Sequence, residues 1–364
     1  MSSSPHPSST PLRRASKKIA SDHHTPPVTS QVDLQGSLSK EIHDHAWKFD
    51  ANRIAEMLSA TGEGPPEMLV DSAHEVLRKM NSPSWPTAGT ERDWYPPIAL
   101  FLNNCVKVCN GALRGSESAA AKDPHRSLYD RLKFIVYDET TEDGVEGAAP
   151  VKLDLVGGLD LVSNERVAWS PTNLQKDPPT KQVLFPVEVE ADWAPMVNQA
   201  ATYARCLFSA SPSRQFTIVL GFRHVEAEFR FLVFHRGGLT GSHSLSVKDG
   251  PGQKGILRIL LSILDWKSPE DAGFLGVYNE IEMSLLRYKD DETGVVGRVA
   301  EVLHDGLCVL GRASRVLLVD YSTSKGKEKE SRIPSLGPAA GTRKRLLEAQ
   351  TKQESRMSFH HRYI

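Results

Sequence analysis

The sequence predicts an α+β protein built on a mixed β-sheet with flanking helices. Three observations lead to this fold class. An amphipathic helix pattern ends near residue 113, three short runs of β-forming residues follow up to residue 190, and a second helix pattern separates these from two further runs. A helix, three strands, a helix and two strands in this order favour a mixed sheet over a repeating βαβ barrel.

The helix before the first strand has the clearest pattern in the chain, and shorter helical segments at 47–60 and 66–80 precede it. Apolar residues recur at the spacing of one buried helix face: Ile98, Phe101, Leu102, Cys105, Val106, Cys109 and Leu113. Pro96 and Pro97 suit the first helical turn. Cys105 and Cys109 lack two further ligands at a metal-binding spacing, so we expect both in the core.

The expected strands cover 133–137, 152–156, 183–190, 216–222 and 229–234, with a helix at 194–210 between the third and the fourth. Pro186 lies near the start of the third strand. It favours an edge position or the first residues of a strand, because proline has no N–H to donate to a ladder. Further along, the pattern predicts helices at 256–264 and 295–303 and a hairpin at 307–319.

The composition excludes several classes of protein. Among 364 residues, 44 Lys and Arg against 45 Asp and Glu give a formal net charge of -1, which argues against a tail-driven nucleic-acid binder. No stretch has the ~18–20 consecutive apolar residues of a membrane span, and four cysteines are too few for a disulfide scaffold. We therefore expect an intracellular protein, cytoplasmic or nuclear, without a membrane partner.

Both ends of the chain are expected to be disordered, because they contain too few large apolar residues to offset the entropy of ordering. The N-terminal tail, 1–46, contains Arg13-Arg14-Ala15-Ser16, which predicts a phosphorylation site at Ser16 or part of a nuclear-import patch. The tail at 322–364 has a basic surplus that suits an acidic partner. An α+β domain at 47–294 and a hairpin at 295–321 are expected between the tails.

Three carboxylates and two polar helix residues form the main candidate for chemistry. Asp154 belongs to one expected strand, and Glu188 and Glu190 are two apart on another, which places these two on one face. Gln199 and Tyr203 are four apart on the next helix and would project together toward that sheet. Oxygen ligands of this kind suit Mg²⁺, which can activate a water at a phosphate. The alternative is a solvated acidic strand face.

This arrangement resembles the PD-(D/E)xK nuclease core, and the Gln199-x-x-x-Tyr203 element is similar to the RecB-type branch of that superfamily. The resemblance implies a restriction-endonuclease-like sheet, a metal site at Asp154 and Glu188, and a nucleic acid as substrate. It also implies a lysine two residues after Glu188, where this chain has Glu190. Without that cation, the charge that develops on a phosphate lacks its usual partner.

A second resemblance covers roughly residues 90 to 320. This part of the chain is similar to the region that precedes and opens the kinase domain of fungal-type protein kinases. Six stretches carry it: Val187-Glu188-Val189-Glu190, Gln199 to Arg205, Arg214-Gln215-Phe216, Phe234 to Gly238, Gly241-Ser242, and Gly306 to Val316. The last stretch resembles the hairpin with which that kinase domain begins, which implies that Gly311 and Arg312 would lie over the nucleotide.

Catalysis is not expected from this resemblance, because no His-Arg-Asp loop and no Asp-Phe-Gly metal motif follows the hairpin. ATP would bind only if a complete kinase lobe were present. We therefore expect a truncated kinase-family protein that acts as a regulatory or binding module for a protein partner. The alternative hypothesis is a Mg²⁺-dependent nuclease that uses Asp154 and Glu188.

Overall fold

The protein is described by a computed structural model, which covers residues 45–81, 83–87, 89–116, 127–141, 151–169, 181–211, 214–235 and 237–274, with residues 39, 42 and 43 before them. Four further strands lie between residues 287 and 349. The chain divides into two compact units, Met1–Gly276 with Leu307–Gly311, and Val277–Gly306 with Arg312–Ile364. Each unit is described by itself.

An eight-stranded sheet forms the centre of the first unit, in the order β1-β9-β8-β7-β6-β3-β2, with β10 paired to β8. Its strands are β1 (Ala46–Phe49), β2 (Leu132–Thr140), β3 (Lys152–Leu159), β6 (Phe185–Glu190), β7 (Phe216–Arg223), β8 (Glu228–His235), β9 (Gly238–Ser242) and β10 (Leu245–Ser246). β2, β3 and β6 are antiparallel neighbours, and β7 runs parallel to β6. The short strands β4 (Val167–Ala168) and β5 (Lys181–Gln182) pair separately. The expected mixed sheet is confirmed.

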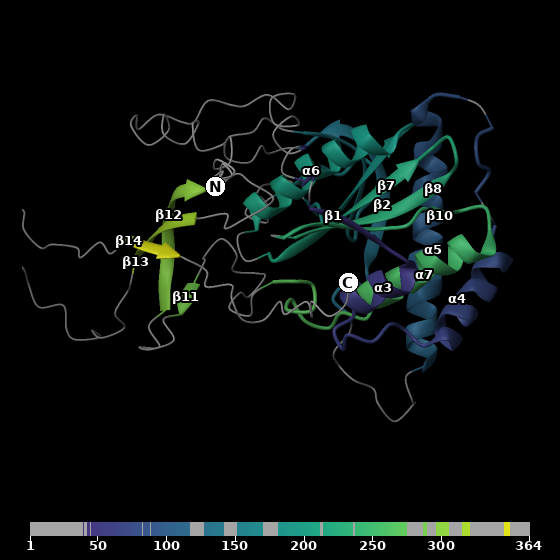
Figure 1. The fold of residues 1–364 in the computed structure, drawn as a ribbon, viewed down its shortest axis with the longest axis horizontal. Helices are drawn as coiled ribbons and strands as arrows, with labels where there is room; N and C mark the ends of the chain where they lie inside the picture. The colour runs from purple at the N-terminus through teal and green to yellow at the C-terminus, as the bar shows by residue number, and fades with distance from the viewer. Residues whose placement is uncertain are drawn as a thin grey trace, which may run out of the picture. The chain divides into compact units, whose positions relative to one another are not determined.

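Helices cover both faces of this sheet (Figure 1). They are α3 (Ala51–Leu58), α4 (Glu67–Lys79), α5 (Tyr95–Ser116), α6 (Trp193–Ala210) and α7 (Gly250–Leu264), with the 3-10 helix η1 (Glu91–Trp94) directly before α5. α6 packs on β6 and β7, while α5 packs on β2 and against α4 and α7. The expected α+β class is therefore confirmed. Among the described helices, none has the length and apolar character that crossing a membrane requires.

Alternate residues of β8 pack against different helical layers. On β8, Leu232 and Phe234 belong to the core cluster that contains the buried residues of α6. Phe229, on the other face, stacks on Phe101 of α5 with ring centroids 6.1 Å apart. A strand buried on both faces reads as a continuous apolar run, which is why β8 lacks the alternation of a half-exposed strand.

Helix α5 has the buried face that its sequence predicts. Ile98, Leu102, Cys105 and Cys109 are completely buried, and both cysteines are free thiols. Burial raises the pKa of each thiol well above its ordinary value. The expectation that the two cysteines lie in the core is confirmed.

Pro186 lies in the middle of the sheet and not at its edge. β6 is bounded by β3 on one side and by β7 on the other, so the edge position that proline favours is wrong for this strand. The alternative, a place among the first residues of the strand, is confirmed, because Pro186 is the second residue of β6. It faces Val156 of β3 in the register.

The folded part of the chain begins earlier than the sequence pattern predicts. Trp47–Phe49 belong to β1, which is paired with β9, where the sequence predicts the start of a helix. Ile42 is 3% exposed, so packing begins before the expected boundary at residue 46. α7 likewise starts at Gly250, six residues before the expected helix. Asp249 caps it, since its carboxylate accepts a hydrogen bond from the Gly252 N–H at 2.6 Å.

The second unit contains an antiparallel sheet in the order β11-β12-β13-β14. Its strands are β11 (Arg287–Lys289), β12 (Val296–Asp305), β13 (Arg315–Asp320) and β14 (Leu346–Ala349). The helix expected at 295–303 is wrong, because this segment is β12, paired on both sides. Its three valines favour a strand once partners are present. Of the hairpin expected at 307–319, only β13 lies within the described residues.

The β1–β9 pair supplies a test of the fold. Gly238 has a φ of +146°, and a Cβ there would collide with the carbonyl oxygen of His45. Gly238→Ala is expected to lower the free energy of unfolding by about 2–3 kcal/mol, from backbone strain and overpacking together. Urea denaturation measures the change.

Gly241→Ala is the matched control in the same strand, since its Cβ would meet Leu232 at an ordinary 3.5 Å. This variant is expected to stay within about 1 kcal/mol of the unsubstituted chain. Equal effects of the two substitutions would contradict the described pairing of β1 with β9.

Candidate functional site

Asp154 and Glu188 lie side by side on the adjacent central strands β3 and β6. The register pairs Leu155 with Val187, and one further step brings Asp154 opposite Glu188. Residues directly opposite on antiparallel strands project from the same face. Both side chains are buried, with exposed fractions of 8% for Asp154 and 6% for Glu188. The structure therefore brings together the two carboxyl groups on which the candidate site depends.

Each oxygen of Asp154 accepts a hydrogen bond. Oδ1 accepts from the Tyr95 hydroxyl at 2.8 Å, and Oδ2 accepts from the backbone N–H of Val189 at 2.9 Å. The Tyr95 hydroxyl also contacts Glu91, one turn earlier in the chain. Since this hydroxyl has one hydrogen, both contacts are hydrogen bonds only if one of the two carboxyl groups is protonated. The bond to Val189 crosses from β3 to β6 just beyond the paired residues, so the carboxylate takes the place of a backbone acceptor there.

Glu188 interacts with the hydroxyl of Tyr203 on α6. Its Oε2 lies 2.6 Å from the Tyr203 oxygen, which is also 2.9 Å from the carbonyl oxygen of Lys152 and 3.3 Å from the amide nitrogen of Gln199. A hydroxyl has one hydrogen and cannot donate to both oxygens. All contacts are satisfied if Glu188 is protonated and donates to Tyr203, and Tyr203 donates to Lys152.

The electrostatics agree with a protonated Glu188. Burial raises its pKa well above the ordinary value, and the nearby charge of Asp154 raises it further. Burial also raises the pKa of Asp154, to about 6, against the opposing effect of the hydrogen bonds from Val189 and Tyr95. Burial therefore favours the protonated form of both carboxyl groups, against the hydrogen bonds that lower the pKa of each.

Glu190 brings further negative charge to this end of β6. It is half-buried, and both burial and the charge of Glu91 raise its pKa. The cation that acts on Asp154 is Lys152, two residues earlier on β3, whose charge lowers the pKa of Asp154. The ammonium of Lys152 forms an ion pair with Asp138 at 2.5 Å.

Tyr95, Glu91 and Lys152 were not anticipated as members of this site from the sequence. A signal was present for each of them. Glu91 and Tyr95 have the i, i+4 spacing of side chains that meet on a helix. Lys152 and Asp154 are two residues apart on one strand, and this spacing places their side chains on the same face. Nothing in the sequence indicates that Val189 supplies a backbone donor.

The two carboxyl groups are already engaged by protein groups. The ligands of Mg²⁺ are ionised oxygens, and burial, which raises the pKa of both Asp154 and Glu188, works against that ionisation. Within the described part of the chain, no group of three or more His, Cys, Asp or Glu residues could hold a metal ion. The geometry favours a structural carboxyl network over a magnesium centre.

Three further predicted residues cannot be placed. Ser16, the expected phosphorylation site, and Gly311 and Arg312, expected over a nucleotide, lie outside the described residues.

Comparison with known proteins adds no identification to this geometry. No family model matches the chain, and no curated protein or solved structure matches it. The interpretation of the site therefore depends on its residues and contacts.

The carboxyl network predicts an unusual dependence of stability on pH. Because the pKa of Asp154 is raised in the folded state, its stabilising contribution is complete below about pH 4 and is lost as the pH rises toward 6. Asp154→Asn removes the ionisation and still lets the side-chain oxygen accept from Val189. Between pH 4 and 6.5, the unsubstituted chain is expected to lose about 2–3 kcal/mol of its free energy of unfolding through Asp154. The Asp154→Asn variant is expected not to show this loss.

Urea denaturation at a series of pH values measures this difference. Glu139→Gln is the control, since Glu139 is an exposed carboxylate on β2 and its loss is expected to leave the pH profile unchanged. Parallel profiles for Asp154→Asn and the unsubstituted chain would show that Asp154 is not protonated in the folded protein.

Proposed function

We propose that this protein is a non-catalytic binding module, built on a nuclease-like sheet and related to the region that precedes the kinase core in fungal-type protein kinases. The observation that carries the proposal is the carboxyl network. Asp154 and Glu188 stand where the resemblance expects the nuclease carboxylates, but hydrogen bonds with Tyr95, Val189 and Tyr203 satisfy them internally.

The order of the elements supports the nuclease-like part of the proposal. The sequence of elements α5, β2, β3, β6, α6, β7 is a helix, three antiparallel strands, a crossover helix and a strand parallel to the last of the three. Asp154 lies on the second of these strands, Glu188 on the third, and Gln199 and Tyr203 on the crossover helix. This is the placement that the resemblance to PD-(D/E)xK cores implies.

The chemistry of the site argues against hydrolysis. A phosphodiester nuclease needs an activated water and a cation for the charge that develops on the phosphate. Glu190 occupies the position of the expected lysine, and Lys152 is engaged by Asp138. A protonated Glu188 cannot serve as an anionic ligand. These residues are therefore retained for the support that they give to the sheet.

The proposal predicts that the purified chain has no nuclease activity. Single- and double-stranded DNA incubated with the protein and Mg²⁺ or Mn²⁺ is expected to remain intact, with no difference between the unsubstituted chain and Asp154→Asn. Gel analysis of the labelled DNA measures this. Metal-dependent cleavage that Asp154→Asn abolishes would establish the nuclease alternative in its place.

The kinase-related part of the proposal needs its own experiment. A fungal-type kinase domain, expressed separately, is expected to form a complex with this chain in calorimetry, and the chain alone is expected to transfer no γ-phosphate to a general protein substrate. Failure to bind would contradict the binding role. Phosphate transfer that Gly311→Trp abolishes would contradict the absence of catalysis.

A further inference from the structure

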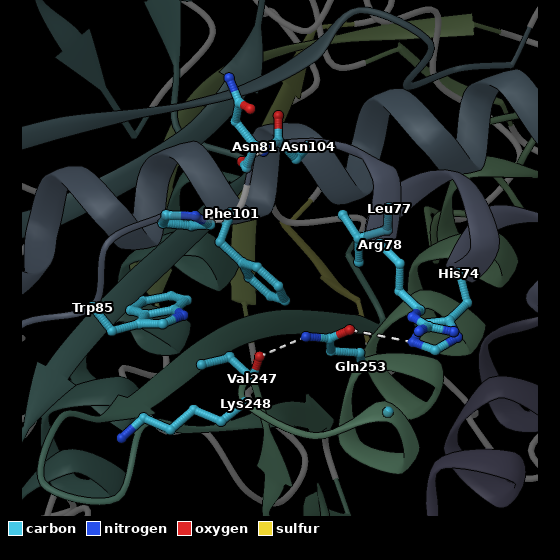
Figure 2. Close-up of a pocket in the computed structure, with 12 residues that line it drawn as sticks. His74, Leu77, Arg78, Asn81, Trp85, Phe101, Asn104, Val247, Lys248 and Gln253 are labelled. Atoms are coloured by element: carbon cyan, nitrogen blue, oxygen red, sulfur yellow. Dashed lines mark hydrogen bonds between the residues drawn. The ribbon is translucent and has the colours of Figure 1, made fainter.

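A pocket of about 620 Å³ lies on the first unit between α4, α5 and the start of α7, apart from the carboxyl network (Figure 2). None of the residues of that network lines it. Its volume falls within the range of about 300–1,000 Å³ that is typical of sites for small molecules. The pocket therefore needs an explanation of its own.

The charged residues that line the pocket are cationic. Arg78 lies on α4 and Lys248 precedes α7, and no Asp or Glu is among the lining residues. Arg78 is exposed and has only a long ion pair with Glu75, at 3.6 Å. Lys248 is exposed, and no described acidic side chain forms an ion pair with its ammonium group. A pocket with this charge attracts an anion.

The apolar wall is aromatic and rigid. Trp85 is half-buried, and its ring lies 6.1 Å from Trp94, 5.7 Å from Phe101 and 5.9 Å from Phe222, measured between ring centroids. Contacts on several sides hold the indole in one orientation before any ligand arrives. A preorganised aromatic side chain of this kind provides a surface on which a planar ring can stack at low entropic cost.

Polar groups of fixed orientation line the floor and the opposite wall. The amide nitrogen of Gln253 donates to the carbonyl oxygen of Val247 at 2.8 Å, so its amide oxygen is the acceptor for Nε2 of His74 at 3.2 Å. Asn81 and Asn104 lie on the other side of the pocket (Figure 2). Their amides offer both donors and acceptors, as recognition of a heterocyclic edge requires.

We propose that this pocket binds a mononucleotide. Trp85 and Phe101 lie at one end of the pocket, and Arg78 and His74 lie at the other (Figure 2). The base stacks at the Trp85 end, and the phosphate is held at the opposite end by the Arg78 guanidinium. A nucleotide combines the planar ring, the polar edge and the anionic group that these walls match. The inference rests on the pocket alone and not on the proposed function.

Isothermal titration calorimetry of the full chain with AMP and GMP tests this assignment. At least one of the two is expected to bind with one site per chain, and at least tenfold more tightly than adenosine, guanosine or inorganic phosphate, because each of those supplies only part of the ligand. Binding of phosphate as tight as that of the nucleotides would overturn the proposal, since it would show a simple anion site. Failure of both nucleotides to bind at millimolar concentration would also overturn it.

Surface variants identify the site without disturbing the core. Arg78→Ala is expected to weaken nucleotide binding at least fivefold, and Lys248→Ala less than that, because the Lys248 ammonium lies away from the Arg78 end (Figure 2). Arg53→Ala is the control for the first, because Arg53 also forms an exposed ion pair with a glutamate three residues away, outside the pocket. Lys267→Ala is the control for the second, since Lys267 is exposed and does not line the pocket. Equal effects of pocket and control variants would place binding elsewhere.

Discussion

The first unit depends on the burial of two carboxyl groups where β3 and β6 meet. A buried carboxyl group without partners would cost several kcal/mol, so its neighbours must supply hydrogen bonds. Asp154 obtains them from Tyr95 and from the backbone of Val189, and Glu188 forms its own with the Tyr203 hydroxyl. The first residue of α5, the end of β6 and the middle of α6 are thereby tied to a single point of the sheet.

This constraint connects the two helical layers. Tyr95 belongs to α5 and Tyr203 to α6, and their hydroxyl groups reach neighbouring strands of the sheet that separates the two helices (Figure 1). The core around α6 is mainly apolar, although Thr202 and Arg205 of this helix are also buried. A polar network that is fully satisfied specifies one packing arrangement, because any displacement leaves a buried group without its partner.

The near-zero net charge of the chain conceals separate acidic and basic regions within the first unit. Glu91, Asp154, Glu188 and Glu190 concentrate negative charge at the end of β3 and β6, where each raises the pKa of a neighbour. Arg78 and Lys248 instead face a pocket that no carboxylate lines. Asp154 and Glu188 are buried within the sheet, whereas Arg78 and Lys248 are exposed beside the pocket.

The sequence by itself determined the order of α5, β2, β3, β6, α6, β7 and β8, the buried face of α5 and the candidate carboxylates, because these follow from local periodicity and residue type. It did not indicate the central position of Pro186, the strand at Trp47–Phe49 or the strand β12, since each depends on partners distant in the chain. Only the tertiary structure decided that Asp154 and Glu188 are internally bonded. Tyr95, Val189 and Tyr203, which satisfy them, meet those carboxyl groups only when the sheet and both helical layers are assembled.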